Sequence, residues 1–185
     1  MIPTREEALA ILKQYNKEDF HLQHAQIVAG VLEWFAREHD PERLDYWYVV
    51  GLLHDVDFEL YPEQHCLKGE EILRSLSIDQ SVIQSAMSHG WSMTNSKYQP
   101  ELFMEKILFA IDELTGLIGA TVVMRPSGSV SDLEVKSLKK KFKQPSFAAG
   151  VSREAIQLGA DQLGWDLDDL MQQTILAMRS LDIVD

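Results

Sequence analysis

The chain has 185 residues, a length typical of one domain, so we expect a single domain over residues 1–185. Hydrophobic residues make up 45% of the chain and charged residues 25%, a balance that excludes intrinsic disorder and predicts a sizeable core. The formal net charge of −12 disfavours nucleic acid polymers and anionic membrane surfaces as partners. A single cysteine, Cys66, excludes an internal disulfide and gives no sign of an oxidising compartment.

The apolar segments are too short to cross a membrane. The longest, at residues 46–53 and 117–124, have eight residues each, whereas a membrane-spanning helix needs about 18 or more. Residues 1–7 contain no apolar region of the kind found in signal peptides. We therefore expect a cytoplasmic protein without a membrane partner.

Apolar residues recur at helical spacing along most of the chain, and no long run alternates apolar and polar residues. Six helices are predicted before residue 125, at about residues 5–15, 20–38, 41–55, 65–75, 79–88 and 103–118. Asp40 and Pro41 are typical of the N-cap and first residue of a helix, here the third. The segment 90–100 is polar and turn-like.

Three further helices are expected within residues 130–185, after a break at Pro126–Gly128. The expected N-caps are Ser131 (in a capping box with Glu134), Ser152 and Asp166. The prediction is an all-α bundle of about nine helices. One of these helices carries five lysines, which either form a solvated face or contribute to phosphate binding: Lys136, Lys139, Lys140, Lys141 and Lys143.

The chain contains two His-Asp dipeptides, a number that chance supplies easily. His39-Asp40 ends one polar helix and begins the next, which favours a purely structural role. His54-Asp55 instead closes the most apolar helix of the chain. A buried carboxylate beside an imidazole costs several kcal/mol unless a cation compensates it, and a divalent metal is the usual compensation. This second dipeptide is therefore a candidate metal ligand pair.

Further metal-ligating residue types lie on inward faces or at helix ends. His24 and Asp112 share the apolar faces of the second and sixth helices, His65 begins the fourth helix, and His89 ends the fifth. One inward histidine is more often a satisfied core residue, but recurrence on five helices indicates a common site. Imidazole and carboxylate together suit Fe, Mn, Zn, Co or Ni rather than Ca. His21, three residues before His24, is a weaker candidate.

These residues resemble the HD-domain superfamily of metal-dependent phosphohydrolases, whose pattern is a His, then His-Asp, then a distant Asp on a helical bundle. His24, His54-Asp55 and Asp112 match it in order, and the segments 65–73 and 88–89 resemble members with extra histidines. The stretch 52–59 is closest to small stand-alone HD hydrolases. The similarity covers most of residues 20–120, and residues 130–185 add a less diagnostic tail.

The chain departs from this pattern in places. His89 is followed by Gly90-Trp91 rather than by a second histidine, and His54-Asp55 is not followed by Ile-Gly. The Gly-Tyr-Pro signature of the cyclic-di-GMP phosphodiesterases is absent. The resemblance therefore does not extend to that substrate.

The resemblance implies one divalent ion held by His24, His54, Asp55 and Asp112, and a second held by His65 and His89, with Asp55 bridging the two. It implies hydrolysis of a small phosphorylated or nucleotide-like molecule by a metal-activated water. Lys68 is either a phosphate contact or acid, or an exposed helix lysine.

Several alternatives stay open. Glu113 and Asp57 either orient ligands or are surface charges. An HD-fold di-iron oxygenase would present nearly the same ligands, and a nucleotide-binding regulatory module would bind without turnover. The sequence fixes neither the number of ions, one or two, nor the oligomeric state, for which a homodimer is one option.

Overall fold

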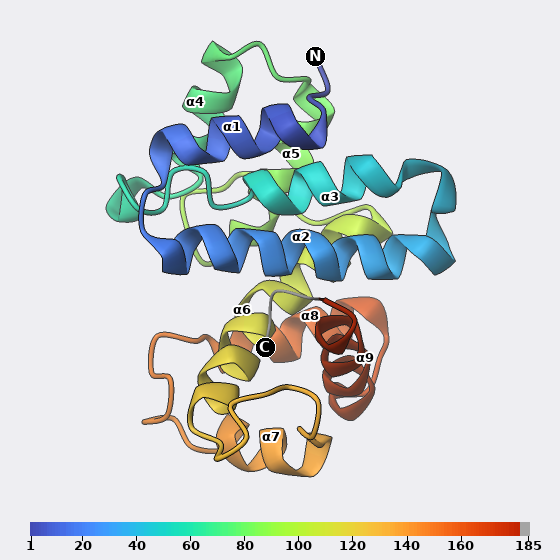
Figure 1. The fold of residues 1–185 in the computed structure, drawn as a ribbon. Coiled ribbons are helices and arrows are strands. Elements are labelled where there is room, and N and C mark those ends of the chain that lie inside the picture. Colours follow the sequence, from blue (N-terminus) through green and yellow to red (C-terminus); the bar gives the residue numbers. More distant parts are fainter. Residues whose placement is uncertain (182–185) are drawn as a thin grey trace.

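The computed structural model describes residues 1–181, and these residues form an all-helical fold without strands, as predicted (Figure 1). The nine α-helices are α1 (Arg5–Tyr15), α2 (Asp19–His39), α3 (Leu44–Leu53), α4 (Leu67–Ser75), α5 (Gln80–Met87), α6 (Phe103–Val123), α7 (Val135–Phe142), α8 (Arg153–Leu163) and α9 (Leu167–Arg179). Three short 3₁₀ turns connect them: η1 (Pro41–Arg43), η2 (Pro62–Gln64) and η3 (Ser88–Gly90). Residues 182–185, which belong to the predicted C-terminal region, lie outside the described residues.

The two longest helices, α2 and α6, organise the fold. In Figure 1, α1, α3 and α2 lie one below the other in the upper half, and α6 descends from them to α7, α8 and α9 in the lower half. α2 packs mainly against α3, and α6 packs mainly against α8. The middle of α6 therefore lies where the two halves of the molecule meet.

Glycine permits the close approach of two of these helix pairs. A Cβ atom on Gly51 of α3 would lie 2.7 Å from Cα of Ala29 in α2, and one on Gly159 of α8 would lie 2.5 Å from Cα of Ala110 in α6. Such contacts are closer than any side chain tolerates, so α3 can lie directly on α2 only because residue 51 is glycine. This packing brings the end of α3 against the face of α2 that carries His24.

Two predicted helix starts differ from the structure, one in part and one fully. The chain becomes helical at Pro41 with Asp40 in the N-cap position, as expected, but as the 3₁₀ turn η1, and α3 begins at Leu44. The Asp40 carboxylate makes no capping hydrogen bond; it accepts a hydrogen bond from Trp47 Nε1 at 2.9 Å and pairs with Arg43 at 2.6 Å. The seventh helix begins at Val135, without the expected capping box at Ser131. Ser131 Oγ instead accepts a hydrogen bond from Ser129 Oγ at 2.9 Å.

The other two expected N-caps are in place at α8 and α9. The Ser152 hydroxyl accepts a hydrogen bond from Ala155 N at 3.1 Å, as expected for an N-cap. Asp166 occupies the N-cap position of α9, although its side chain makes no capping hydrogen bond. None of the helices among the described residues combines the length and apolar character of a membrane span.

Candidate metal centre

The first group of potential ligands comes from three helices that pack against one another or lie side by side in the fold. His24 lies in α2, His54 and Asp55 directly follow α3, and Asp112 lies in the middle of α6. One nitrogen or oxygen atom of each side chain lies within 4.8 Å of those of the other three. The closest pairs are His24 Nε2–Asp112 Oδ1 at 3.1 Å, His54 Nε2–Asp112 Oδ1 at 3.3 Å and His54 Nε2–Asp55 Oδ2 at 3.3 Å. The structure thus brings together the four residues expected to share a metal, and we call them the first group.

His65, Cys66 and His89 form a second group, and their ligand atoms also lie within 4.8 Å of one another. His65 follows the turn η2, and His89 lies in the turn η3 directly after α5. A short turn joins α4 to α5, so the start of α4 and the end of α5 lie at the same end of the pair. The Nε2 atoms of His65 and His89 are 2.9 Å apart.

The sequence suggested that His65 begins the fourth helix, but in the structure His65 lies before that helix. It is followed by Cys66, which adopts a left-handed conformation with φ of 65°, and α4 starts only at Leu67. His89 likewise lies two residues beyond the end of α5, in η3. Both histidines of the second group therefore lie in the connecting turns, outside α4 and α5.

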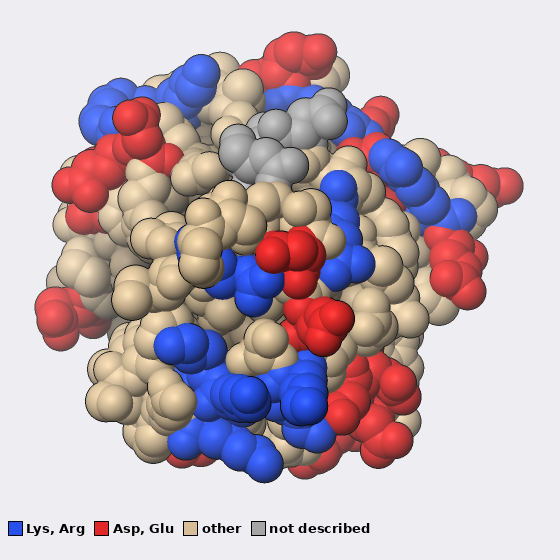
Figure 2. Space-filling view, turned by 60° about the horizontal axis from the view of Figure 1, so that its bottom comes forward, with Lys and Arg blue, Asp and Glu red and all other residues tan. Residues whose placement is uncertain are grey.

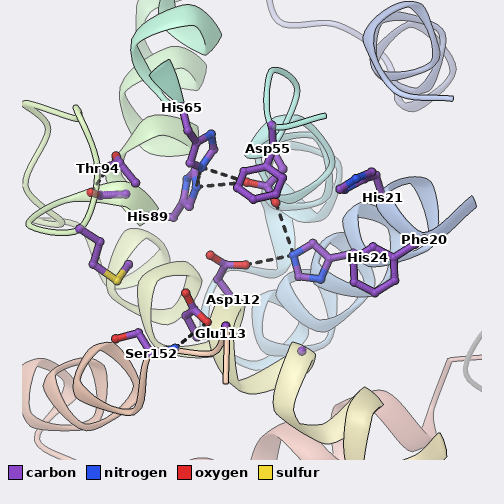
Figure 3. Close-up of a pocket in the computed structure, with 15 residues that line it drawn as sticks. Phe20, His21, His24, Asp55, His65, His89, Thr94, Asp112, Glu113 and Ser152 are labelled. Carbon is purple, nitrogen blue, oxygen red and sulfur yellow. Dashed lines mark hydrogen bonds and ion pairs between the residues drawn. The ribbon is translucent and has the colours of Figure 1, made fainter. Parts of the chain in front are cut away.

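Asp55 lies between the two groups and has one carboxylate oxygen on each side. Oδ2 faces the first group, 3.3 Å from His54 Nε2 and 3.6 Å from His24 Nε2. Oδ1 faces the second group, 3.2 Å from His65 Nε2 and 3.3 Å from His89 Nε2 (Figure 3). One side chain thus touches ligands of both groups.

Three of the four histidines have a ring orientation that suits metal ligation. Each donates its Nδ1 hydrogen outward and turns Nε2 inward. The acceptors are Gly51 O for His54 (2.7 Å), Ala86 O for His89 (2.6 Å) and Asp57 Oδ1 for His65 (2.8 Å). Because a carbonyl or carboxylate oxygen accepts but does not donate, these contacts leave the Nε2 lone pairs free in the neutral rings. Metal-ligating histidines are usually oriented in this way.

The carboxylates at the centre favour the binding of a cation. His54 Nε2 is buried and has no hydrogen-bond partner among the described residues, yet it faces the carboxylates of Asp55 and Asp112. Burial lowers the pKa of His54, but the charge of Asp55 and the contact with Asp112 outweigh it and raise the pKa to about 9. Burial also raises the pKa of Asp55, but the charge of His54 and the contacts with the imidazoles hold it well below its usual range. The site therefore attracts positive charge, whether protons or a metal ion.

A cavity of about 530 Å³ opens onto both groups. Its lining includes the side chains of Phe20, His21, Phe58, Met93, Thr94 and Glu113 beside the ligands (Figure 3). No lysine or arginine is among the lining residues. His21 lines this cavity but belongs to neither ligand group; its ring packs against Phe58 with centroids 5.8 Å apart.

A second cavity, of about 740 Å³, adjoins the first. The two share four lining residues: Phe20, His24, Gly116 and Gly150. Most of the other lining residues of the second cavity are apolar or small, among them Ile27, Ala120, Val123 and Met124. An organic group attached to a molecule at the metal centre has room to extend in this direction.

Asp57 and Glu113, whose roles the sequence left open, are both hydrogen-bonded near the centre, Asp57 fully buried and Glu113 partly buried. Asp57 is fully buried and accepts hydrogen bonds from His65 Nδ1 at 2.8 Å and from Gly69 N at 2.6 Å, so it orients a histidine of the second group. Glu113 lines the metal cavity and accepts a hydrogen bond from Ser152 N at 3.0 Å. Burial and the charge of Asp112 raise the pKa of Glu113 to about 7.

The structure does not bring Lys68 to the metal centre. Its Nζ lies 2.6 Å from Glu71 Oε2 on the surface of α4, and the residue does not line the cavity. The lysines of α7 do not line the cavity either, and they form an exposed basic patch (Figure 2). Lys139 there pairs with Asp168 at 2.6 Å. A position on the solvated surface therefore fits Lys68 and the lysines of α7 better than a contact with phosphate at the metal centre.

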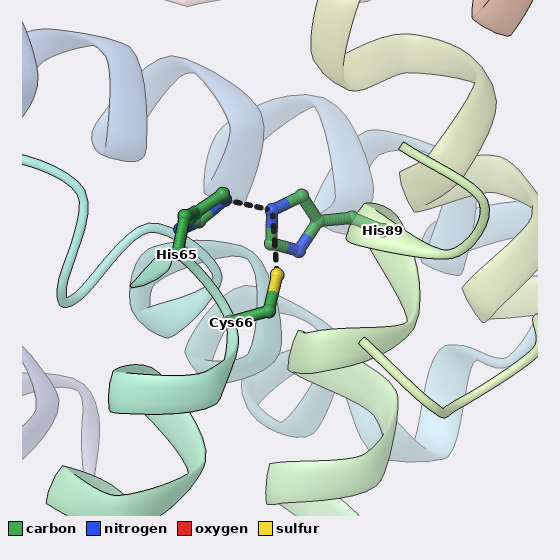
Figure 4. A group of neighbouring side chains, drawn as sticks. All are labelled: His65, Cys66 and His89. Carbon is green, nitrogen blue, oxygen red and sulfur yellow. Dashed lines mark hydrogen bonds between the residues drawn. The ribbon is translucent and has the colours of Figure 1, made fainter. Parts of the chain in front are cut away.

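Cys66 is the residue of this centre that the sequence did not indicate. Its thiol is buried between the two histidines of the second group (Figure 4). Burial raises the pKa of this thiol, but the charge of His89 and the hydrogen bonds of the two imidazoles outweigh it and bring the pKa to about 6. The adjacency of Cys66 to His65 was the only signal available.

The helical fold and its His/Asp cluster are compatible with an HD-type protein. No family model, curated protein or solved structure matches the chain.

Proposed function

We propose that this protein is a metal-dependent phosphohydrolase that holds two divalent ions, one in each ligand group. The observation that carries the proposal is the placement of Asp55, which directs Oδ2 toward His24 and His54 and Oδ1 toward His65 and His89. One carboxylate in contact with two sets of inward-facing imidazoles fits a pair of neighbouring ions. Sites with two ions about 3.5–4 Å apart are typical of phosphatases.

The residues present fit such ions. His24, His54, Asp55 and Asp112 would hold the first ion, and His65, His89 and Asp55 would hold the second. Imidazole nitrogen and carboxylate oxygen together are suitable ligands for Fe, Mn, Zn, Co or Ni. When bound, the ions supply an acidified water as nucleophile and positive charge for the phosphoryl group. The similarity of the ligand order to the HD pattern favours the same reaction.

The cavity lining supports a small phosphorylated molecule as the substrate. With no lysine or arginine in the lining, the protein itself offers little positive charge to a phosphoryl group. The bound ions would have to provide the positive charge, so the phosphoryl group would bind favourably only beside the two ligand groups. The adjoining apolar cavity would receive the organic part of the substrate.

A substrate screen tests the proposal directly. The protein, reconstituted separately with Mn, Fe, Co, Ni or Zn, is incubated with phosphomonoesters, nucleotides and cyclic nucleotides, and phosphate release or product formation is measured. We expect hydrolysis of at least one substrate class with at least one metal, and none with Asp55→Asn. Lack of hydrolysis throughout, with oxygen consumption by the iron-loaded protein, would replace the proposal with an oxygenase.

A further inference from the structure

We infer that Cys66 is a thiolate ligand of the second ion, so that His65, Cys66, His89 and Asp55 form a mixed sulfur, nitrogen and oxygen site. The inference rests on the proposed function in so far as it takes a second ion to bind beside Asp55. It assigns to that position a thiolate donor that the first group lacks, and with it a preference for softer metal ions.

The separations among the nitrogen and oxygen donors, and between the sulfur and one imidazole, are close to those of a tetrahedral site. A tetrahedral zinc ion with bonds of about 2.0–2.1 Å to nitrogen or oxygen and about 2.3 Å to sulfur would place its N and O ligands about 3.3 Å apart and sulfur about 3.6 Å from nitrogen. In the structure, the Nε2 atoms of His65 and His89 are 2.9 Å apart, and Asp55 Oδ1 lies 3.2 Å and 3.3 Å from them. Cys66 Sγ lies 3.8 Å from His89 Nε2.

The backbone at Cys66 helps to set the position of the thiol. Its φ of 65° lies in the left-handed region, which is unfavourable for a residue with a Cβ atom. Here the conformation follows His65 directly and leaves the buried thiol beside both imidazoles (Figure 4).

Gly90 leaves the space in which the sulfur lies. A Cβ atom on Gly90 would come within 2.4 Å of Cys66 Sγ, so a side chain at position 90 would collide with the sulfur. Because residue 90 is a glycine, the Cys66 sulfur fits beside the backbone that follows His89. The position of Cys66 is consequently defined from two sides, by the turn before α4 and by the turn η3.

A thiolate changes which metals this position favours. Soft sulfur ligands select zinc and similar ions, whereas sites made of imidazole and carboxylate also accept harder ions such as Mn. We therefore expect the second position to prefer Zn or Co over Mn, and the first position to discriminate less. Because of this difference, we expect that the protein can bind zinc at the second position and another metal at the first.

Cobalt(II) spectroscopy of the full chain tests the assignment. Cobalt bound to a thiolate shows a sulfur-to-metal charge-transfer band in the near ultraviolet, and Cys66 is the only cysteine of the chain. We expect this band in the wild type at two bound equivalents of cobalt. Cys66→Ala and Cys66→Ser should lose the band and bind the second cobalt at least about tenfold more weakly, while the first cobalt remains bound. Circular dichroism checks that both variants keep their helical content, and the serine variant preserves the size of the side chain.

Two results would overturn the inference. Two cobalt equivalents without a charge-transfer band, or a band that persists in Cys66→Ala, would show that the sulfur is not a ligand, although the two-ion proposal would stand. Binding of a single cobalt without the band, unaffected by His65→Ala, would remove the second position itself and with it both proposals.

Discussion

The two ligand groups on either side of Asp55 differ in how the chain holds them. His24 and Asp112 of the first group project from long packed helices, the second turn of α2 and the middle of α6, and His54 follows directly on α3. All three residues of the second group lie in turns, at the start of α4 and after the end of α5. The first group offers oxygen and nitrogen alone, whereas the second includes the thiol of Cys66. We therefore expect the first position to be set by helix packing and the second by its supporting hydrogen bonds.

The largest effect is expected where the two groups meet. In Asp55→Ala both positions lose a ligand, so we expect the loss of both ions and of all hydrolytic activity without loss of helical content. Metal analysis after gel filtration and circular dichroism provide the measurements. Unchanged turnover of this variant in excess metal would contradict the shared role of Asp55.

Removal of a ligand that belongs to one group should separate the two positions. Asp112→Asn is expected to lose the ion of the first group, and His89→Ala the ion of the second, so that each variant retains one equivalent instead of two. The retained ion should differ in kind, with zinc persisting in Asp112→Asn. Identical metal content in the two variants would show that the groups do not act independently.

A smaller effect is expected behind the second group. Asp57 accepts the Nδ1 hydrogen of His65 and so keeps the Nε2 lone pair directed at the centre. Loss of such a supporting carboxylate typically weakens metal binding by about 10–100-fold. Asp57→Asn should therefore lower the affinity for the second ion within this range and leave the first unchanged, as measured by competition with a chelator. Equal weakening of both positions would point to a general loss of structure.

The smallest effect is expected at Lys68. Because its ammonium group pairs with Glu71 outside the metal cavity, Lys68→Ala should retain the kcat/KM of the wild type for any substrate that the screen identifies. Lys97→Ala, another surface lysine paired with a glutamate, is a matched control. A large loss of kcat in Lys68→Ala alone would restore the lysine to the reaction.

The first group could be predicted because the evidence for it is local. The helical repeat places His24 on the face of Val28 and Val31, and Asp112 on the face of Leu108 and Thr115, so their inward orientation follows from the sequence. The second group was predictable only in part. A pair of helices joined by a short turn brings its ends together, but no residue pattern around Cys66 indicates its positive φ, which the structure alone reveals.

The same distinction applies to the fold. Nine helices follow from the period of apolar residues, and the start of α8 follows from Ser152. The expected start at Ser131 is wrong, and Asp40 precedes a helical turn at Pro41 without making a capping hydrogen bond. Asp40 bonds instead to Trp47, and Ser131 to Ser129. Capping residues compete with such partners, and the sequence does not show which partner is nearer in space.

Anomalous X-ray diffraction from crystals of the metal-reconstituted protein tests the central claim most directly, since it locates each ion relative to Asp55. We expect two peaks about 3.5–4 Å apart, one beside Asp55 Oδ2 within the first group and one beside Oδ1 within the second. A single peak, or two peaks of which one does not touch the Asp55 carboxylate, would contradict the account.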